Sequence, residues 1–204
     1  MRLNNKVILI TGAATGLSNE IQGIGGATAW KCAQEGAKVI IADISDEMGA
    51  ETAKQITEMG GYARYLHLDV TNEDNWIAAY ESIESIEGNL NVLVNNAGTG
   101  IPNYDLSSTG ARNPEEALMV EYTTIEGLET QLKVHAQGVL LGMKHAIPFL
   151  RKQQGGSIIN LKTGGGKTVL ALYIISLLKK KTVVLCHKSF LCDQWIERIL
   201  QFPL

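Results

Sequence analysis

Short apolar runs alternate along this chain with longer segments whose apolar residues recur at helical spacing. The short runs are rich in β-branched residues and lie at 7–11, 38–42, 63–68, 91–94, 157–161 and 182–186. The longer segments lie at 24–35, 46–59, 73–86, 124–153, 167–181 and 190–201. Near-continuous apolar strands that alternate with helices indicate a parallel sheet covered on both faces. The pattern therefore predicts a doubly wound α/β fold of three layers.

Glycine, proline and capping residues mark several boundaries between these segments. Gly60 and Gly61 stop one predicted helix, and Thr71 followed by Asp74 predicts a capping box at the start of the next. The stretch 99–123 gathers proline, serine and glycine, which predicts a loop with at most one short helix.

Composition narrows the class of protein. The 204 residues are 45% hydrophobic and carry a net charge of −3, which excludes a disordered chain and favours one domain or slightly more. No apolar run is long enough to span a membrane, and the mildly acidic balance argues against a dedicated nucleic-acid surface. Three cysteines and the lack of a signal-peptide pattern predict a soluble, cytoplasmic protein. We expect no metal site.

Two glycine clusters surround the start of the first long segment. Thr-Gly-Ala-Ala-Thr-Gly at 11–16 follows the first strand, and Gly-Ile-Gly-Gly at 23–26 opens the helix. Glycines here let the backbone turn tightly and approach a diphosphate, whose charge then lies on the helix N-terminal amides. We expect Gly12, Gly16, Gly23 and Gly25 to bind a dinucleotide. The alternative is a tight turn without a ligand.

Asp43, at the end of the second strand, is the acidic group expected on an adenosine ribose. It lies 31 residues after Gly12. Gly23 comes seven residues after Gly16, and removing this seven-residue interval restores a conventional spacing. A carboxylate accepts hydrogen bonds from ribose hydroxyls and repels a 2′-phosphate, so Asp43 favours NAD over NADP. The alternative is a solvated Asp that caps the following helix.

Residues 1 to about 162 resemble the short-chain dehydrogenase/reductase family. The resemblance rests on the glycine motif, split by an insertion, and on Asp69-Val70, Asn95-Asn96-Ala97-Gly98, and the segments 138–144 and 155–160. It implies a Rossmann-like dinucleotide-binding domain over 1–162, with strand order 3-2-1-4-5-6 and a C-terminal truncation. It also implies a small alcohol or ketone substrate. The cofactor residues that it implies beyond the glycines and Asp43 are Asp69, Val70, Asn95, Ala97 and Gly98.

The sequence departs from this family where catalysis is expected. Thr163 stands in place of the serine that orients the substrate oxygen, and Ser176 in place of the acid/base tyrosine. Lys180 occupies the approximate lysine position, but the chain contains no Tyr-x-x-x-Lys. His135 stands where the family usually has an asparagine. The resemblance therefore implies an oxidoreductase with an incomplete catalytic set, Thr163 being the remaining catalytic candidate.

A second phosphate-loop pattern, Leu-Lys-Thr-Gly-Gly-Gly-Lys-Thr, follows at 161–168. Gly166, Lys167 and Thr168 would hold the phosphates and Mg²⁺ of ATP. Residues 161–204 resemble the start of a superfamily 2 helicase, without its acidic strand motif or second domain. We therefore treat 163–204 as a separate segment that would complete the same sheet. The alternatives are an ATP-binding helicase fragment, a non-functional chimera, or a glycine turn with a solvated lysine. Substrate and oligomeric state stay open.

Overall fold

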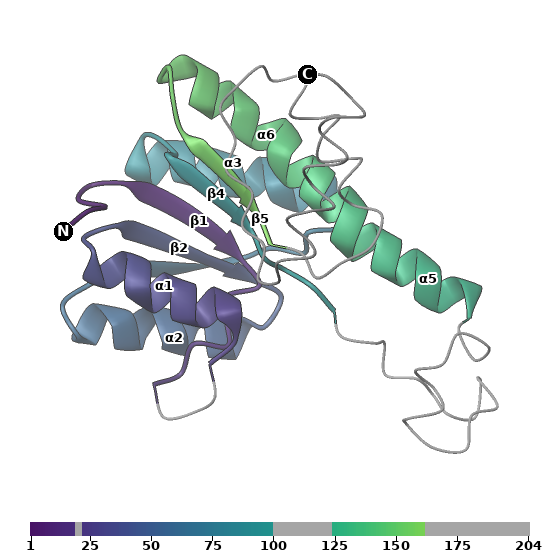
Figure 1. The fold of residues 1–204 in the computed structure, drawn as a ribbon, viewed down its shortest axis with the longest axis horizontal. Helices are drawn as coiled ribbons and strands as arrows, with labels where there is room; N and C mark the ends of the chain where they lie inside the picture. The colour runs from purple at the N-terminus through teal and green to yellow at the C-terminus, as the bar shows by residue number, and fades with distance from the viewer. Residues whose placement is uncertain (19–21, 100–123, 162–204) are drawn as a thin grey trace, which may run out of the picture.

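The computed structural model describes residues 1–18, 22–99 and 124–161, which form a sheet with helices on both faces (Figure 1). In chain order the elements are β1 (Val7–Thr11), α1 (Ile24–Gln34), β2 (Lys38–Asp43), α2 (Asp46–Glu58), β3 (Tyr62–His67), α3 (Glu73–Glu87), β4 (Val92–Asn95), α5 (Ile125–Leu132), the π-helical turn η3 (Lys133–Gln137), α6 (Gly138–Lys152) and β5 (Ser157–Asn160).

The five described strands are all parallel, in the order β3-β2-β1-β4-β5. Val7 pairs with Lys38 of β2, and Ile8 pairs with Val92 of β4, so the chain adds strands first on one side of β1 and then on the other. This confirms the predicted α/β class and strand order for five strands. The sixth expected strand, at 182–186, lies outside the described residues.

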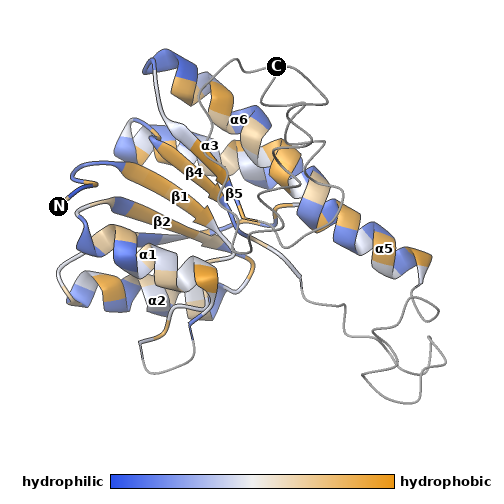
Figure 2. Cartoon of the chain, viewed as in Figure 1, coloured by the Kyte–Doolittle hydropathy of each residue, from blue (hydrophilic) through white to orange (hydrophobic). Residues whose placement is uncertain are grey.

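The sheet separates two hydrophobic cores. Alternate residues of β1 face opposite ways: Ile8 and Ile10 pack with α1 and α2, whereas Val7 and Leu9 pack with α3 and α6. All five residues of β1 are buried, as expected for a strand covered on both faces. Figure 2 shows the hydrophobic character of β1, β2 and β4 between the helical layers.

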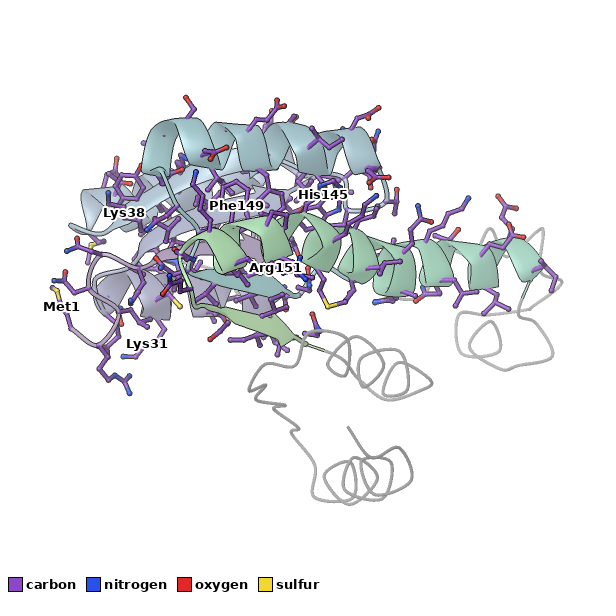
Figure 3. All side chains as sticks on the ribbon, turned by 90° about the horizontal axis from the view of Figure 1, so that it is seen from above. Met1, Lys31, Lys38, His145, Phe149 and Arg151 are labelled. Carbon is purple, nitrogen blue, oxygen red and sulfur yellow. The ribbon has the colours of Figure 1, made fainter. Side chains whose placement is uncertain are left out.

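Aromatic and polar contacts join α3 to α6 on one face of the sheet. Tyr80 lies 5.3 Å from Phe149 between ring centroids, and its hydroxyl donates to the Gly142 carbonyl at 3.1 Å. Figure 3 shows Phe149 and His145 on α6, beside α3. Glu73, at the start of α3, accepts from Lys144 at 2.6 Å and pairs with His145 at 2.9 Å. The hydrogen bond from Lys144, followed by that from His145, lowers the pKa of Glu73.

Two local predictions need correction. The cap of α3 is Asn72, whose side chain accepts from the amides of Asp74 and Asn75, whereas the Thr71 hydroxyl donates to Asp69. The single helix expected at 124–153 is interrupted by η3, where the turn widens before α6. Figure 1 shows that α5 continues the line of α6 past the end of the sheet.

No helix in the described part of the chain is long and apolar enough to cross a membrane.

Candidate functional site

The predicted site residues gather at the carboxyl edge of the sheet, around the point where the strand order reverses. β1 and β4 lie side by side there, and the loop that follows β1 leads into α1. In open parallel sheets this reversal creates the crevice in which ligands bind. Thr11, Asp43 and Asn95 end three neighbouring strands at this edge.

Glycine is required at two positions where the first loop meets its neighbours. Gly12 has a φ of +66°, and a Cβ there would lie 2.6 Å from the Ala97 Cα. A Cβ on Gly25, in the first turn of α1, would collide with the Gly12 carbonyl oxygen. The loop and the helix therefore lie in backbone contact, as close binding of a dinucleotide requires.

The described residues on either side of the expected insertion, up to 18 and from 22, contact each other. The Gly23 amide donates to the Thr15 carbonyl at 2.8 Å, which closes the base of the excursion directly before α1. A Cβ on Gly26 would lie 2.5 Å from the Gly16 Cα, so the two ends of the loop remain in contact. The two described ends of the expected insertion are therefore in contact with each other, directly before α1.

The N-terminus of α1 suits an anion better than the other helix starts do. Its cap, Gly23, offers no side-chain hydrogen bond, and its first turn contains no acidic residue. In the described ranges, the other helices that begin after a loop, α2, α3 and α5, each have an acidic residue in the first turn. Within the described part of the chain, the first-turn amides and the positive dipole end of α1 are therefore available to an external negative group such as a diphosphate.

Asp43 lies beside this loop with its carboxylate already oriented. Its Oδ2 accepts from the Ala14 amide at 3.0 Å, and its Oδ1 accepts from the Ser45 amide at 3.2 Å. Ser45 is the N-cap residue of α2, so the second bond forms a turn directly before the helix and does not cap an amide within it. Each carboxylate oxygen can accept a further hydrogen bond, so both remain able to bind ribose hydroxyls.

A polar cluster adjoins Asp43 at the ends of β2 and β3. The Tyr65 hydroxyl lies 2.7 Å from the Asp43 carbonyl and 2.6 Å from Asp46 Oδ1, which is also 2.6 Å from His67 Nδ1. The hydrogen bond from Tyr65, followed by that from His67, lowers the pKa of Asp46. Burial is the main cause that raises the pKa of Tyr65. Negative charge therefore persists next to the expected ribose position.

Asp69 and Val70 follow β3 and differ in accessibility. Asp69 Oδ1 accepts from the amide and hydroxyl of Thr71, at 2.9 and 2.8 Å, which fixes the carboxylate near the loop. Val70 is 8% exposed, and its carbonyl accepts from the Trp76 indole at 2.9 Å. Val70 therefore belongs mainly to the core. Of the two residues, Asp69 is the better placed to contact the adenine of a dinucleotide.

The Asn-Asn-Ala-Gly tetrad joins three strands at the crevice. The buried Thr11 hydroxyl accepts from the amides of Asn96 and Ala97, at 3.1 and 3.0 Å. The Asn96 side chain donates to the carbonyls of Thr11 and Gly12 at 3.0 and 2.8 Å. Sequence reasoning missed Thr11 and Asn96 as site residues, although both stand inside the quoted motifs. They hold the fourth strand's end against the glycine loop.

Asn95 and Gly98 contact elements outside this junction. Asn95 is buried, and its side-chain amide donates to Asn160 Oδ1 at 2.8 Å, which ties β4 to β5. A Cβ on Gly98 would lie 2.7 Å from the His135 ring on η3. His135 Nε2 is 3.2 Å from the Thr99 carbonyl, so this histidine contacts the segment directly after the tetrad. Short π-helical turns are frequent at functional sites.

In the described part of the chain, most of the predicted cofactor residues lie at the carboxyl ends of β1, β2 and β4 and at the start of α1: Gly12, Gly16, Gly23, Gly25, Asp43, Asn95, Ala97 and Gly98. Asp69 and Val70 follow β3, the strand beside β2. The expected catalytic position, Thr163, and the second phosphate loop, Gly166, Lys167 and Thr168, lie outside the described residues. Ser176 and Lys180 also lie outside them.

Comparison with known proteins assigns this chain to a family. The family described as short chain dehydrogenase matches residues 6–175, and the chain belongs to that family. The match continues past residue 162 into the segment where we expected a helicase-like phosphate loop. It lends no support to the helicase resemblance, which stays a prediction.

Individual relatives are identical to this chain at about a third of the aligned positions. It is 36% identical over 162 residues to 2,5-dichloro-2,5-cyclohexadiene-1,4-diol dehydrogenase of Sphingobium indicum, covering 79% of this chain and 56% of the relative. It is 34% identical over 164 residues to cyclopentanol dehydrogenase of Comamonas testosteroni, with the same coverage. The chain therefore spans about half the length of the curated relatives it matches.

Solved structures agree with the fold. The crystal structure of gox2181 superposes with a TM-score of 0.66 at 25% identity, covering 83% of this chain and 56% of that one. A hydroxysteroid dehydrogenase from Escherichia coli superposes with a TM-score of 0.61 at 24% identity, covering 78% and 55%.

Proposed function

We propose that this chain binds NAD as an oxidoreductase of the short-chain dehydrogenase type. The observation that carries the proposal is the uncapped start of α1, in backbone contact with the glycine loop, with the Asp43 carboxylate fixed beside that loop. The helix start supplies amides for a diphosphate, and Asp43 supplies acceptors for two ribose hydroxyls.

A preference for NAD over NADP follows from charge. A 2′-phosphate would lie next to Asp43 and near Asp46, whose pKa is lowered by its hydrogen bonds to Tyr65 and His67. Bringing a phosphate close to these two carboxylates costs electrostatic free energy. Asp69 would contact the adenine, and Asn95, Ala97 and Gly98 would line the nicotinamide end of the crevice.

Bound NAD would supply the hydride acceptor for oxidation of a small alcohol, or NADH the donor for reduction of a ketone. Thr163 would orient the substrate oxygen through its hydroxyl. Because no Tyr-x-x-x-Lys is present, we expect proton transfer to be impaired and turnover to be low. ATP binding at Gly166, Lys167 and Thr168 rests on the sequence pattern alone.

Calorimetric titration with NAD, NADP and ATP tests these proposals separately. We expect NAD to bind more tightly than NADP, and Asp43→Ala to weaken NAD binding at least tenfold by removing charged acceptors. Lys167→Ala should leave NAD affinity unchanged and serves as the matched control. Absence of NAD binding at millimolar concentration would contradict the proposal. Loss of NAD binding in Lys167→Ala, with Asp43→Ala unaffected, would instead place the nucleotide at the second loop.

A further inference from the structure

Ala14 of the glycine loop is held through both of the peptide units that flank its Cα. The Ala14 amide donates to Asp43 Oδ2 at 3.0 Å, and the Ala14 carbonyl accepts from the Thr52 hydroxyl at 2.7 Å. Asp43 ends β2, whereas Thr52 lies on the buried face of α2. Each peptide plane beside Ala14 therefore keeps a hydrogen bond to a neighbouring element, and the Ala14 carbonyl also accepts from the Gly16 amide at 2.8 Å.

The bond made by Thr52 differs from those of other helical threonines in this chain. Thr28, Thr57 and Thr130 each donate to the carbonyl four residues earlier in their own helix, at 2.7, 2.9 and 2.9 Å. That bond is the usual local choice for a helical threonine. Thr52, fully buried at 0% exposure, instead reaches a loop 38 residues away in the sequence. The Thr52 hydroxyl therefore donates to the loop and not to a carbonyl of α2.

The rest of the loop is supported by donors from α1 and α2 and by Gln22. The Gly16 carbonyl accepts from the Trp30 indole of α1 at 2.5 Å, and from the Gln22 side chain at 3.1 Å. The Ser18 amide donates to Gln55 Oε1 of α2 at 3.0 Å. Carbonyl oxygens that are paired with helix donors are kept from turning toward a bound anion, which they would repel.

We propose that Thr52 is a positioning residue for the dinucleotide loop. Through Ala14 it fixes the loop's shape before the cofactor arrives, so that less ordering free energy is lost on binding. This inference rests on the proposed NAD binding, but the state of the loop can be measured without any ligand.

Three variants of the full chain separate positioning from general stability. Thr52→Val keeps the shape and removes the hydroxyl, Thr52→Ser keeps the hydroxyl, and Thr57→Val removes a hydroxyl on the same helix that does not touch the loop. Hydrogen exchange of the peptide containing residues 12–18 is measured without ligand, and NAD affinity is measured by calorimetry. We expect faster loop exchange and about tenfold weaker NAD binding in Thr52→Val, with both values near wild type in Thr52→Ser and Thr57→Val.

Equal loop exchange in Thr52→Val and Thr57→Val would overturn the positioning role. Equal NAD affinity in those two variants would also overturn it. If the wild-type chain does not bind NAD, the proposed function fails, and the exchange data still decide whether Thr52 holds the loop.

Discussion

At the residue scale, Gly12 combines a left-handed backbone with a close contact, and the two costs can be separated. Gly12→Ala would place a Cβ at 2.6 Å from Ala97 Cα at a φ of +66°. Gly88→Ala faces a similar φ of +76° with no atom within 4 Å, so it measures the backbone cost alone. We expect urea unfolding to show a loss of about 1 kcal/mol for Gly88→Ala and about 2–3 kcal/mol for Gly12→Ala.

NAD titration of the same two variants adds a functional comparison. Gly12→Ala should weaken NAD binding, because the glycine loop must shift away from β4, whereas Gly88→Ala should not. Equal stability losses in the two variants would show that Ala97 yields to the added methyl group, contrary to the contact argument.

Single residues also mark the limit of prediction from sequence. Asp43 and the four loop glycines could be located because their chemistry and spacing occur within one βαβ unit. Thr52 carried no signal, because its partner Ala14 becomes a neighbour only when α2 packs on the sheet. The two reciprocal hydrogen bonds between Thr11 and Asn96 could not be predicted from the sequence for the same reason.

At the element scale, a buried ion pair fastens the edge strand β3 to the end of α3. Arg64 donates twice to Glu87, at 2.7 and 2.8 Å, and Tyr62 adds a third bond at 3.1 Å. The Glu87 side chain is 1% exposed. Because Glu87→Gln leaves the Arg64 charge without its counter-ion, we expect a loss of about 2–3 kcal/mol in urea unfolding.

Glu84→Gln is the control for this pair, since Glu84 lies on the same helix but pairs with Lys152 in solvent, with exposed fractions of 53% and 75%. An exposed pair of this kind contributes at most about 1 kcal/mol. If both variants lose the same stability, Glu87 does not fasten β3 in the way that its burial indicates.

Element boundaries follow closely from the hydrophobic pattern where a strand is buried on both faces, as β1 and β2 are. The predicted strand at 7–11 matches β1, and the helix predicted at 46–59 ends one residue later than α2. The break at η3 was not predicted, because residues 133–137 contain no proline or glycine that would interrupt a helical period. The π-helical turn η3 could therefore be recognised only from the structure and not from the sequence.

For the whole molecule, NAD binding should appear as a gain in thermal stability. A ligand that binds only the folded chain adds about 2.7 kcal/mol at one hundred times its Kd, which corresponds to roughly 5–10 °C in Tm for a chain of this size. Asp43 and its acidic neighbours predict that NADP at the same concentration gives a smaller shift. Differential scanning fluorimetry with increasing NAD, NADP and ATP measures all three. An NADP shift equal to that of NAD would refute the assigned role of Asp43, whereas a shift with ATP alone would move the nucleotide site to the second loop.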